Sequence, residues 1–418
     1  MIPYSDLNSE RVAGCHFKSE ASSKKLKHRG NILMAACLML LVFFGGCKKD
    51  DRESSNSLDA SFHSSDSDSD SDNGNGNGKP QSGILTAGEW NDLDNWTFWN
   101  DLIGNSSYSS MPDYWKFYNN NRISVKVLTK NGNPLNNAAV EIIRNSTTIF
   151  TARTDNFGRA ELWVDLFQKS GSIDYSSISI VVNGNLEKRS SIPYSQGINE
   201  ITVESQQPEN RIEIALVVDA TGSMGDELEY IKTELVDVIQ KVKSSNSQAA
   251  IYTSAVFYRD EGDEYVARVS NFSNDIFITN SFINKQSANG GGDYPEAVHT
   301  ALEKTVNELQ WSSNAKTRLM FLILDAPPHY QSNVITSIQN SIKKFAEKGI
   351  KIIPVTASGI DKETEFLMRF FAISTNGTYV FITNDSGIGN EHLTPTVGEY
   401  QVEYLNDLLV RLINKYSE

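Results

Sequence analysis

The sequence predicts an α/β protein with a doubly wound, mostly parallel sheet in its C-terminal half and a small all-β sandwich before it. From residue 211 onward, short apolar runs alternate with segments of helical period, which is the pattern of a parallel sheet covered on both faces. Between residues 122 and 203, β-rich runs with Gly and Asn turns show no helical period and favour a small antiparallel sandwich.

Length and charge narrow the class of protein. A chain of 418 residues is expected to form two or three domains. Its 52 Asp and Glu outnumber its 38 Lys and Arg, for a net charge of -14. Nucleic-acid binding needs a basic footprint, so the charge argues against nucleic acid as a partner.

Residues 1–46 are predicted to be a secretory signal. Basic residues at 24–29 precede the apolar stretch 32–44, which is short for a membrane span, and small residues follow it. The end of this segment, Phe44-Gly45-Gly46-Cys47, resembles the lipobox of bacterial lipoproteins. The resemblance implies that Cys47 is lipidated and anchors the chain to a membrane. The alternative is an uncleaved anchor helix.

Three features of the sequence follow Cys47. Lys48-Lys49-Asp50-Asp51 resembles a short export signal of some Gram-negative lipoproteins, which suggests the outer membrane and exposure at the cell surface. Residues 47–84 are rich in Ser, Asp, Asn and Gly and are predicted to be a disordered linker. Residues 85–120 contain four tryptophans and are interpreted as a connector packed onto the next domain.

The predicted sandwich covers residues 121–206. Its strings NGNPLNNAAVEI and TARTDNFGRAELW resemble the carboxypeptidase regulatory-like sandwich of bacterial surface proteins. In that family the module is a spacer or an interaction domain, so the resemblance implies a structural role.

The predicted α/β domain covers residues 210–417. The run 212–218 is apolar throughout, as expected for a central parallel strand, and apolar residues from 228 to 242 follow at helical spacing. Further strands are expected at 250–258, 265–269, 318–324, 350–356 and 379–383, and helices at 295–309, 334–348 and the C-terminal end. In such sheets, ligands bind beyond the carboxyl ends of the strands.

The most informative motif lies at that edge. Asp219, Thr221 and Ser223 directly follow the first apolar run and supply one carboxylate and two hydroxyls on alternate positions. Mg²⁺ takes six oxygen ligands, of which only one or two are usually carboxylates. Other loops must supply the remaining ligands. An acidic turn, Gly290-Gly291-Gly292-Asp293-Tyr294-Pro295-Glu296, and Asp325 after another apolar run are the candidates.

Together these segments resemble the von Willebrand factor type A domain and its metal-ion-dependent adhesion site. By this resemblance, Asp219, Thr221, Ser223 and Asp325 surround the metal, and the acidic turn is similar to that of integrin β subunits. The resemblance implies that Glu296 ligates the central metal and that Asp293 helps to hold a neighbouring ion, but which of the two reaches the central metal stays open.

A second resemblance concerns Ser223-Met224-Gly225-Asp226-Glu227, which is similar to a run that binds an adjacent ion in integrin-like relatives. The alternative is that Asp226 and Glu227 only offset the dipole of the following helix. The expected cofactor is Mg²⁺, with Mn²⁺ or Ca²⁺ as alternatives.

The family resemblance implies metal-dependent binding of a protein ligand, which would offer an Asp or Glu carboxylate. The chain is therefore predicted to be a lipid-anchored binding protein of the cell envelope and not an enzyme. A scaffold subunit of an envelope or secretion complex is the alternative. A serine hydrolase that uses Ser223, with Asp325, His329 and His392 following in hydrolase order, is disfavoured because Thr221 stands where a nucleophile elbow needs Gly.

Overall fold

The computed structural model describes residues 80–105 and 107–418, and these belong to one compact unit, Asn75–Glu418. The predicted signal, Cys47 with its proposed lipid, and most of the predicted linker lie outside the described residues. Within the described part, no helix has both the length and the apolar character needed to cross a bilayer.

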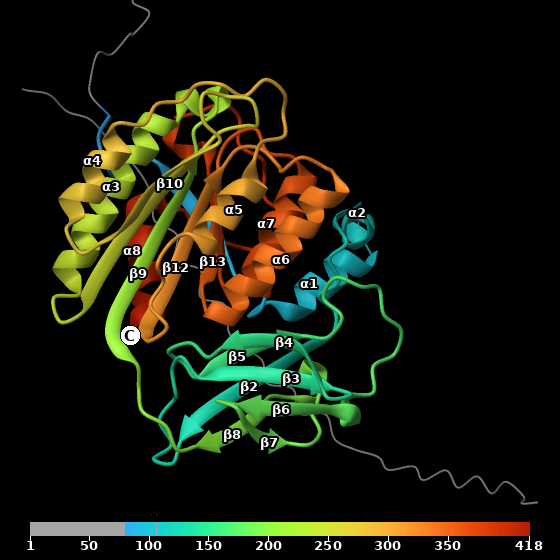
Figure 1. Cartoon of the computed structure of the whole chain (residues 1–418). Coiled ribbons are helices and arrows are strands. Elements are labelled where there is room, and N and C mark those ends of the chain that lie inside the picture. The colour runs from blue at the N-terminus through green and yellow to red at the C-terminus, as the bar shows by residue number, and fades with distance from the viewer. Residues whose placement is uncertain (1–79, 106) are drawn as a thin grey trace, which may run out of the picture. The chain divides into compact units, whose positions relative to one another are not determined.

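A mixed sheet of eight strands is the centre of the molecule (Figure 1). Its five inner strands are parallel, an antiparallel strand closes one edge, and two antiparallel strands close the other. In spatial order the strands are β11 (Ala267–Ser273), β10 (Ala250–Tyr258), β9 (Glu209–Asp219), β12 (Ala315–Leu324), β13 (Lys351–Thr356), β14 (Tyr379–Ile382), β1 (Thr86–Trp90) and β15 (Glu403–Tyr404).

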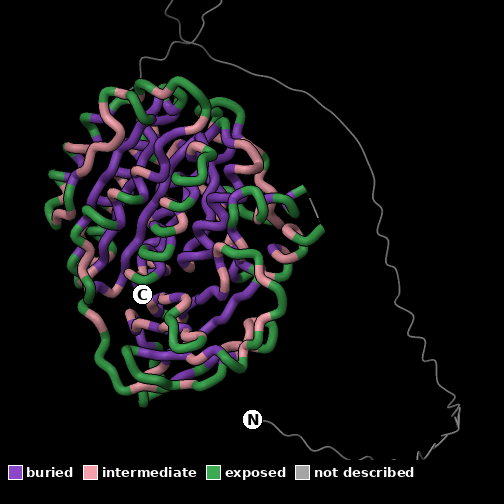
Figure 2. Tube along the Cα trace, turned by 45° about the vertical axis from the view of Figure 1, so that its right-hand side comes forward, coloured by how far each residue is buried: buried purple, intermediate pink, exposed green. Residues whose placement is uncertain are grey.

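Helices cover both faces of this sheet. One buried cluster joins it to α3 (Leu228–Ser245), α4 (Ile276–Asn284) and α8 (Leu405–Ser417). A second cluster joins it to α5 (Val298–Asn307), α6 (Ser332–Lys348) and α7 (Lys362–Ser374). Strand β9 serves both clusters, because Leu216 packs in the first and Val217 in the second. The continuous apolar run of β9 follows from this burial on two faces, and Figure 2 shows the buried core.

The mostly parallel α/β architecture is therefore confirmed, although the element bounds differ from the predicted ones. The helix predicted from residue 295 begins only at Val298, and Glu296 instead forms an isolated bridge with Pro328. Strand β11 lies at 267–273, and α4 and β15 were not predicted. Short 3-10 turns, η4 (Gly222–Asp226) and η5 (Asn384–Ser386), occupy two of the loops at the carboxyl edge of the sheet.

The tryptophan-rich segment is more than a connector, because residues 86–90 form a strand of the large sheet. The segment then continues through α1 (Trp96–Asn105), η1 (Ser107–Ser110) and α2 (Met111–Trp115). Trp99 stacks on Phe366 of α7 with 5.5 Å between ring centroids. Asp92 forms an ion pair with the fully buried Arg369 at 2.6 Å. The segment is thus held to α7 by aromatic packing and by a buried charge pair.

Residues 122–203 form two small sheets. One has the order β5 (Arg159–Trp163), β2 (Arg122–Thr129), β8 (Asn199–Val203), and the other has the order β4 (Thr147–Arg153), β3 (Ala139–Arg144), β6 (Ile178–Val182), β7 (Asn185–Lys188). Strands β2 and β8 pair in parallel, unlike the antiparallel pairing that the sequence suggests. A parallel pair needs a long connection, and about seventy residues separate these two strands. The 3-10 turns η2 (Tyr175–Ser177) and η3 (Tyr194–Gln196) lie in this region.

Candidate metal site

The candidate site begins where two neighbouring parallel strands end. Val218 of β9 pairs with Ile323 of β12, so that the following acids, Asp219 and Asp325, leave the sheet side by side. Strand β10 lies on one side of β9, and β12, β13 and β14 follow on the other side, so the strand order changes direction between β9 and β12. This is the topological switch point, where open α/β sheets bind ligands beyond the carboxyl ends of their strands.

The turn after β9 is organised by Asp219. Its Oδ1 atom accepts hydrogen bonds from the backbone N–H of Thr221 at 2.9 Å and from the Thr221 hydroxyl at 2.7 Å. The hydroxyls of Thr221 and Ser223 lie 3.2 Å apart. The three oxygen-bearing side chains of D-x-T-x-S are therefore gathered at one place, as the motif predicts.

The glycine-rich loop packs directly against this turn. The N–H of Gly222 donates to the carbonyl of Gly290 at 3.1 Å, and the N–H of Asn289 donates to that of Ala220 at 3.1 Å. Gly291 has a φ of +74°, and a Cβ there would lie 3.0 Å from Glu296 Oε1. Glycine thus permits the close approach of the loop to the glutamate.

Glu296 belongs to the site, whereas Asp293 lies outside the group of converging acids. The backbone N–H of Glu296 donates to the carbonyl of Pro327 at 2.8 Å, which fixes it beside the loop that carries Asp325. Its side chain is buried, and the side chain of Asp293 is exposed on the same turn. The position of Glu296 thus favours the glutamate as the residue that faces Asp219.

Three carboxylate oxygens in the site are buried and accept no hydrogen bond within the usual geometric limits: Asp219 Oδ2, Glu296 Oε2 and Asp325 Oδ1. A buried polar atom without a partner costs free energy, and a buried charge without one costs much more. A divalent cation bound near these carboxylates would offset their negative charge. The donor set of carboxylates and hydroxyls matches the oxygen ligands of Mg²⁺.

The electrostatics of the site also fit a cation. Burial raises the pKa of Asp219 above its usual range, and the nearby charge of Asp325 raises it further. Burial likewise raises the pKa of Asp325. For Glu296, burial and the charges of the surrounding acids raise the pKa to about 9. Each acid resists ionisation because no positive charge balances it.

In the described part of the chain, no group of three or more His, Cys, Asp or Glu side chains is placed so that it could hold a metal ion by itself. A cation at this edge would therefore depend on the hydroxyls of Thr221 and Ser223, and on water, as well as on carboxylates. Mg²⁺ commonly keeps several waters when it binds to protein.

Asp226 and Glu227, the predicted adjacent metal site, make protein contacts of their own. Asp226 Oδ2 accepts from the backbone N–H and the side-chain amide of Asn390 at 2.9 and 2.6 Å. Glu227 Oε1 accepts from the N–H of Ser358 at 3.1 Å and lies 3.2 Å from His392 Nε2. Both acids hold neighbouring loops to the start of α3, and Oε2 of the buried Glu227 accepts no hydrogen bond within the usual geometric limits.

The end of strand β10 contributes residues whose part in the site the sequence reasoning missed. Tyr258 pairs with Asp219 in the sheet, and its side chain is buried. Burial raises the pKa of the Tyr258 hydroxyl well above its usual value, and the nearby carboxylates of Asp219, Asp325 and Glu296 raise it further. Arg259 donates to the carbonyls of Ala220 and Ser287 and so ties two site loops together. The sequence offered one signal, because these residues lie at the end of the predicted strand 250–258, and parallel strands present their carboxyl ends at the same edge of the sheet.

The two histidines of the hydrolase alternative are engaged elsewhere. His329 Nε2 lies 2.7 Å from Asp260 Oδ1, rather than bonding to backbone as expected for a turn histidine. His392 Nδ1 lies 2.9 Å from Asn384 Oδ1. The Ser223 hydroxyl lies 3.2 Å from that of Thr221 and interacts with the carboxylate of Asp325, whose pKa it lowers. The geometry gives Ser223 no histidine partner among these contacts.

Comparison with known proteins agrees with this geometry. Residues 213–387 match the sequence model of the von Willebrand factor A domain family, and this range contains all the converging acids. The chain contains a von Willebrand factor A domain. The domain extends from β9 through η5.

Two curated relatives share part of this domain. An ariadne-like RING finger protein of Acanthamoeba polyphaga mimivirus is 33% identical over 122 residues, which is 29% of this chain and 12% of that protein. The alpha-protein kinase vwkA of Dictyostelium discoideum is 29% identical over 132 residues, which is 31% of this chain and 21% of the kinase. The chain thus spans only a small part of the length of either relative.

Two solved structures are also similar, each at 14% identity and over 49% of this chain. BatB from Bacteroides thetaiotaomicron is covered over 98% of its length with a TM-score of 0.34. An aerotolerance-related membrane protein from Bacteroides fragilis is covered over 99% of its length with a TM-score of 0.32.

Proposed function

We propose that the von Willebrand factor A domain binds a protein ligand through a divalent cation, most simply Mg²⁺, held at the carboxyl edge of the large sheet. Asp219, Thr221, Ser223, Glu296 and Asp325 would hold the cation. When bound, it supplies a positive charge with a free coordination position, which a carboxylate of the partner protein can take. The chain itself acts as a binding protein, not as an enzyme.

One observation carries this proposal: three buried carboxylate oxygens at the switch point accept no hydrogen bond within the usual geometric limits. The hydroxyls of Tyr258 and Ser223 lie close enough to lower the pKa of Asp219 and of Asp325, but burial and the neighbouring acids outweigh them. A purely structural set of acids at strand ends would be expected to have donors, because buried polar groups are nearly always paired. Asp361 meets this expectation, since it caps α7 by accepting from the N–H and the hydroxyl of Thr364. Two other acids, Glu89 and Glu227, each also have one buried oxygen without a partner.

The surroundings of the domain fit a binding protein of the cell envelope. The lipobox-like Cys47 would anchor the chain to a membrane, with the segment up to residue 84 as a stalk, and we extend the proposal to the outer membrane and the cell surface. The two small sheets of residues 122–203 would serve as a spacer module of carboxypeptidase regulatory-like type. A scaffold role within an envelope complex would use the same metal contact.

Titration calorimetry with Mg²⁺ tests the proposal. Asp219→Asn and Asp325→Asn should abolish Mg²⁺ binding while the protein stays folded, since each change also removes one of the mutually repelling acids. Asp293→Asn is the matched control, because Asp293 is exposed on the same loop as Glu296. Mg²⁺ binding that survives Asp219→Asn, or that is lost equally in Asp293→Asn, would refute the assignment.

Capture of partners from intact cells tests the second part. The wild-type protein should retain a protein partner in Mg²⁺ and release it in EDTA, and Asp219→Asn should not retain it in either buffer. A partner held equally by both proteins in EDTA would show that the metal site is not the contact.

A further inference from the structure

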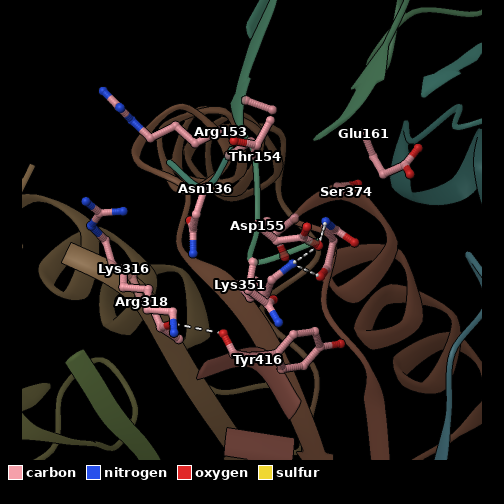
Figure 3. Close-up of a pocket in the computed structure, with 17 residues that line it drawn as sticks. Asn136, Arg153, Thr154, Asp155, Glu161, Lys316, Arg318, Lys351, Ser374 and Tyr416 are labelled. Atoms are coloured by element: carbon pink, nitrogen blue, oxygen red, sulfur yellow. Dashed lines mark hydrogen bonds and ion pairs between the residues drawn. The ribbon is translucent and has the colours of Figure 1, made fainter. Parts of the chain in front are cut away.

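A second polar cavity lies at the opposite edge of the sheet, between the amino ends of β12 and β13 and the small sheets (Figure 3). It has a volume of about 30 Å³. Figure 3 shows Asn136, Arg153 and Asp155 of the small-sheet region opposite Lys351 of β13 and Arg318 of β12. Since the candidate metal site is at the carboxyl ends of the same strands, the two sites are separate.

The cavity contains buried hydrogen-bond donors that have no acceptor. Arg318 is 4% exposed and its Nη2 has no partner, although its Nε donates to Ser312 and its Nη1 to Asn137. Asn136 is 6% exposed and its Nδ2 also has no partner. The hydroxyl of Ser374, which also lines the cavity, is buried and unpaired. Unpaired donors from both sides of the interface call for a shared acceptor.

The charge around the cavity points to an anionic acceptor. Four cationic side chains line it: Arg153, Lys316, Arg318 and Lys351. Three of them already donate to carbonyl oxygens, Arg153 to Asn137 and Glu347, Lys316 to Ser417 and Lys351 to Asn376, so that Arg318 Nη2 is the unpaired cationic donor among the four. Two acids also line the cavity, and both are engaged. Glu161 pairs with Arg122 at 2.7 Å. Asp155 accepts from two backbone N–H groups through one oxygen, and from Asn376 and Lys351 through the other.

The pKa values of the cationic groups are lowered by their burial. Burial lowers the pKa of Arg318 to about 10, and the neighbouring charge of Arg153 adds to the effect, against the partial compensation of Glu213. Burial also lowers the pKa of Lys316 and of Lys351. A negative charge placed among them would offset the loss of hydration.

We infer that this cavity binds a small inorganic anion of the size of chloride. The volume is the reason for this choice, because one water needs about 10–15 Å³ of such space. A cavity of about 30 Å³ therefore has room for one monatomic anion or two waters. The anion joins Arg318 of the von Willebrand factor A domain to Asn136 of the small sheets and so strengthens the contact between them.

Thermal unfolding of the full chain tests the inference. Chloride or bromide should raise Tm in a saturable way relative to gluconate at equal ionic strength. At ten times the dissociation constant, binding to the folded state favours folding about tenfold, which raises Tm by roughly 3 °C. A Tm that does not distinguish chloride from gluconate would overturn the inference and would indicate a cavity filled by water.

Single substitutions test whether the chloride-dependent rise in Tm arises at this cavity. Asn136→Asp keeps the size of the side chain but replaces an unpaired donor with a negative charge, so the chloride-dependent rise in Tm should disappear. Arg318→Gln should do the same. Arg189→Gln is the matched control on the exposed surface of the small sheets and should retain the rise. If the control loses it as well, the effect is general screening and the inference fails.

A direct measurement does not depend on the variants. Crystals of the protein soaked in bromide should show an anomalous peak within hydrogen-bond distance of Arg318 Nη2 and Asn136 Nδ2. A cavity without such a peak, or a peak without any stabilisation in solution and hence an adventitious ion only, would overturn the inference.

Discussion

Replacing Glu296 with glutamine should remove most of the pH dependence of Mg²⁺ binding between pH 8 and pH 9, where Asp219 and Asp325 are already ionised. Burial and the surrounding acids raise the pKa of Glu296 from 4.5 to about 9, which is the largest elevation among the three converging acids. At pH 7, two units lower, about 99% of the cation-free protein holds a proton on this group. Mg²⁺ must displace that proton, at a cost on the order of 3 kcal/mol.

The apparent affinity of the wild-type protein for Mg²⁺ should therefore rise up to about tenfold between pH 8 and pH 9. Glu296→Gln cannot release this proton, so its affinity should be nearly constant over the same range and weaker than wild type at pH 9. Calorimetry in two buffers of different ionisation enthalpy counts the released protons, with about one expected for wild type and none from this position in the variant.

Asp293→Asn is the control, since Asp293 shares the turn but is exposed, and it should keep the wild-type slope. A wild-type affinity that does not change between pH 7 and pH 9 would refute the reasoning. So would a Glu296→Gln variant with the wild-type slope, because the proton would then come from another group.

Three further predictions follow from the same contacts. In EDTA, stability should fall as pH rises from 5 to 9, because folded Glu296 keeps a proton that the unfolded chain has lost, and Mg²⁺ should reduce the fall measured by urea unfolding. Arg369→Leu leaves Asp92 and Glu365 buried without their cation and should cost about 3–5 kcal/mol in the same assay. A fragment of residues 210–417, the predicted domain alone, should show a lower Tm than residues 80–418 by calorimetry, because it lacks β1.

The sequence was sufficient to place the core of the site. An apolar run that ends in Asp219 and another that ends before Asp325 are readable as buried parallel strands, and parallel strands present their carboxyl ends at one edge. The sequence alone did not show which of Asp293 and Glu296 faces Asp219. The answer depends on the backbone hydrogen bond from Glu296 to Pro327, which joins two loops thirty residues apart.

Strand β1 shows a different limit of sequence reasoning. Residues 86–90 lack a clear apolar alternation, and Gly88 in the middle weakens a strand prediction. The structure supplies the reason for the glycine, because a Cβ at this position would lie 2.6 Å from the ring of Phe381 and 2.8 Å from that of Tyr400. The two partners lie about three hundred residues away, so no local pattern could reveal them.

The folding unit is therefore larger than the segment that carries the family pattern. The match at residues 213–387 excludes β1, β15 and α8. Yet the backbone N–H groups of Gly83, Ile84 and Leu85 all donate to the buried carboxylate of Glu234 in α3. Without them, that carboxylate would lose its donors inside the protein, at a cost of several kcal/mol for a buried charge.

The same contacts fix where residues 83–90 join the large sheet. The chain enters the large sheet directly through β1, which pairs with β14, and reaches the small sheets only afterwards. A load on an N-terminal anchor would thus act first on the hydrogen bonds between β1 and its neighbours and on the bonds to Glu234. Because Asp92 follows β1 and pairs with Arg369 of α7, the point of attachment is secured on both faces of the sheet.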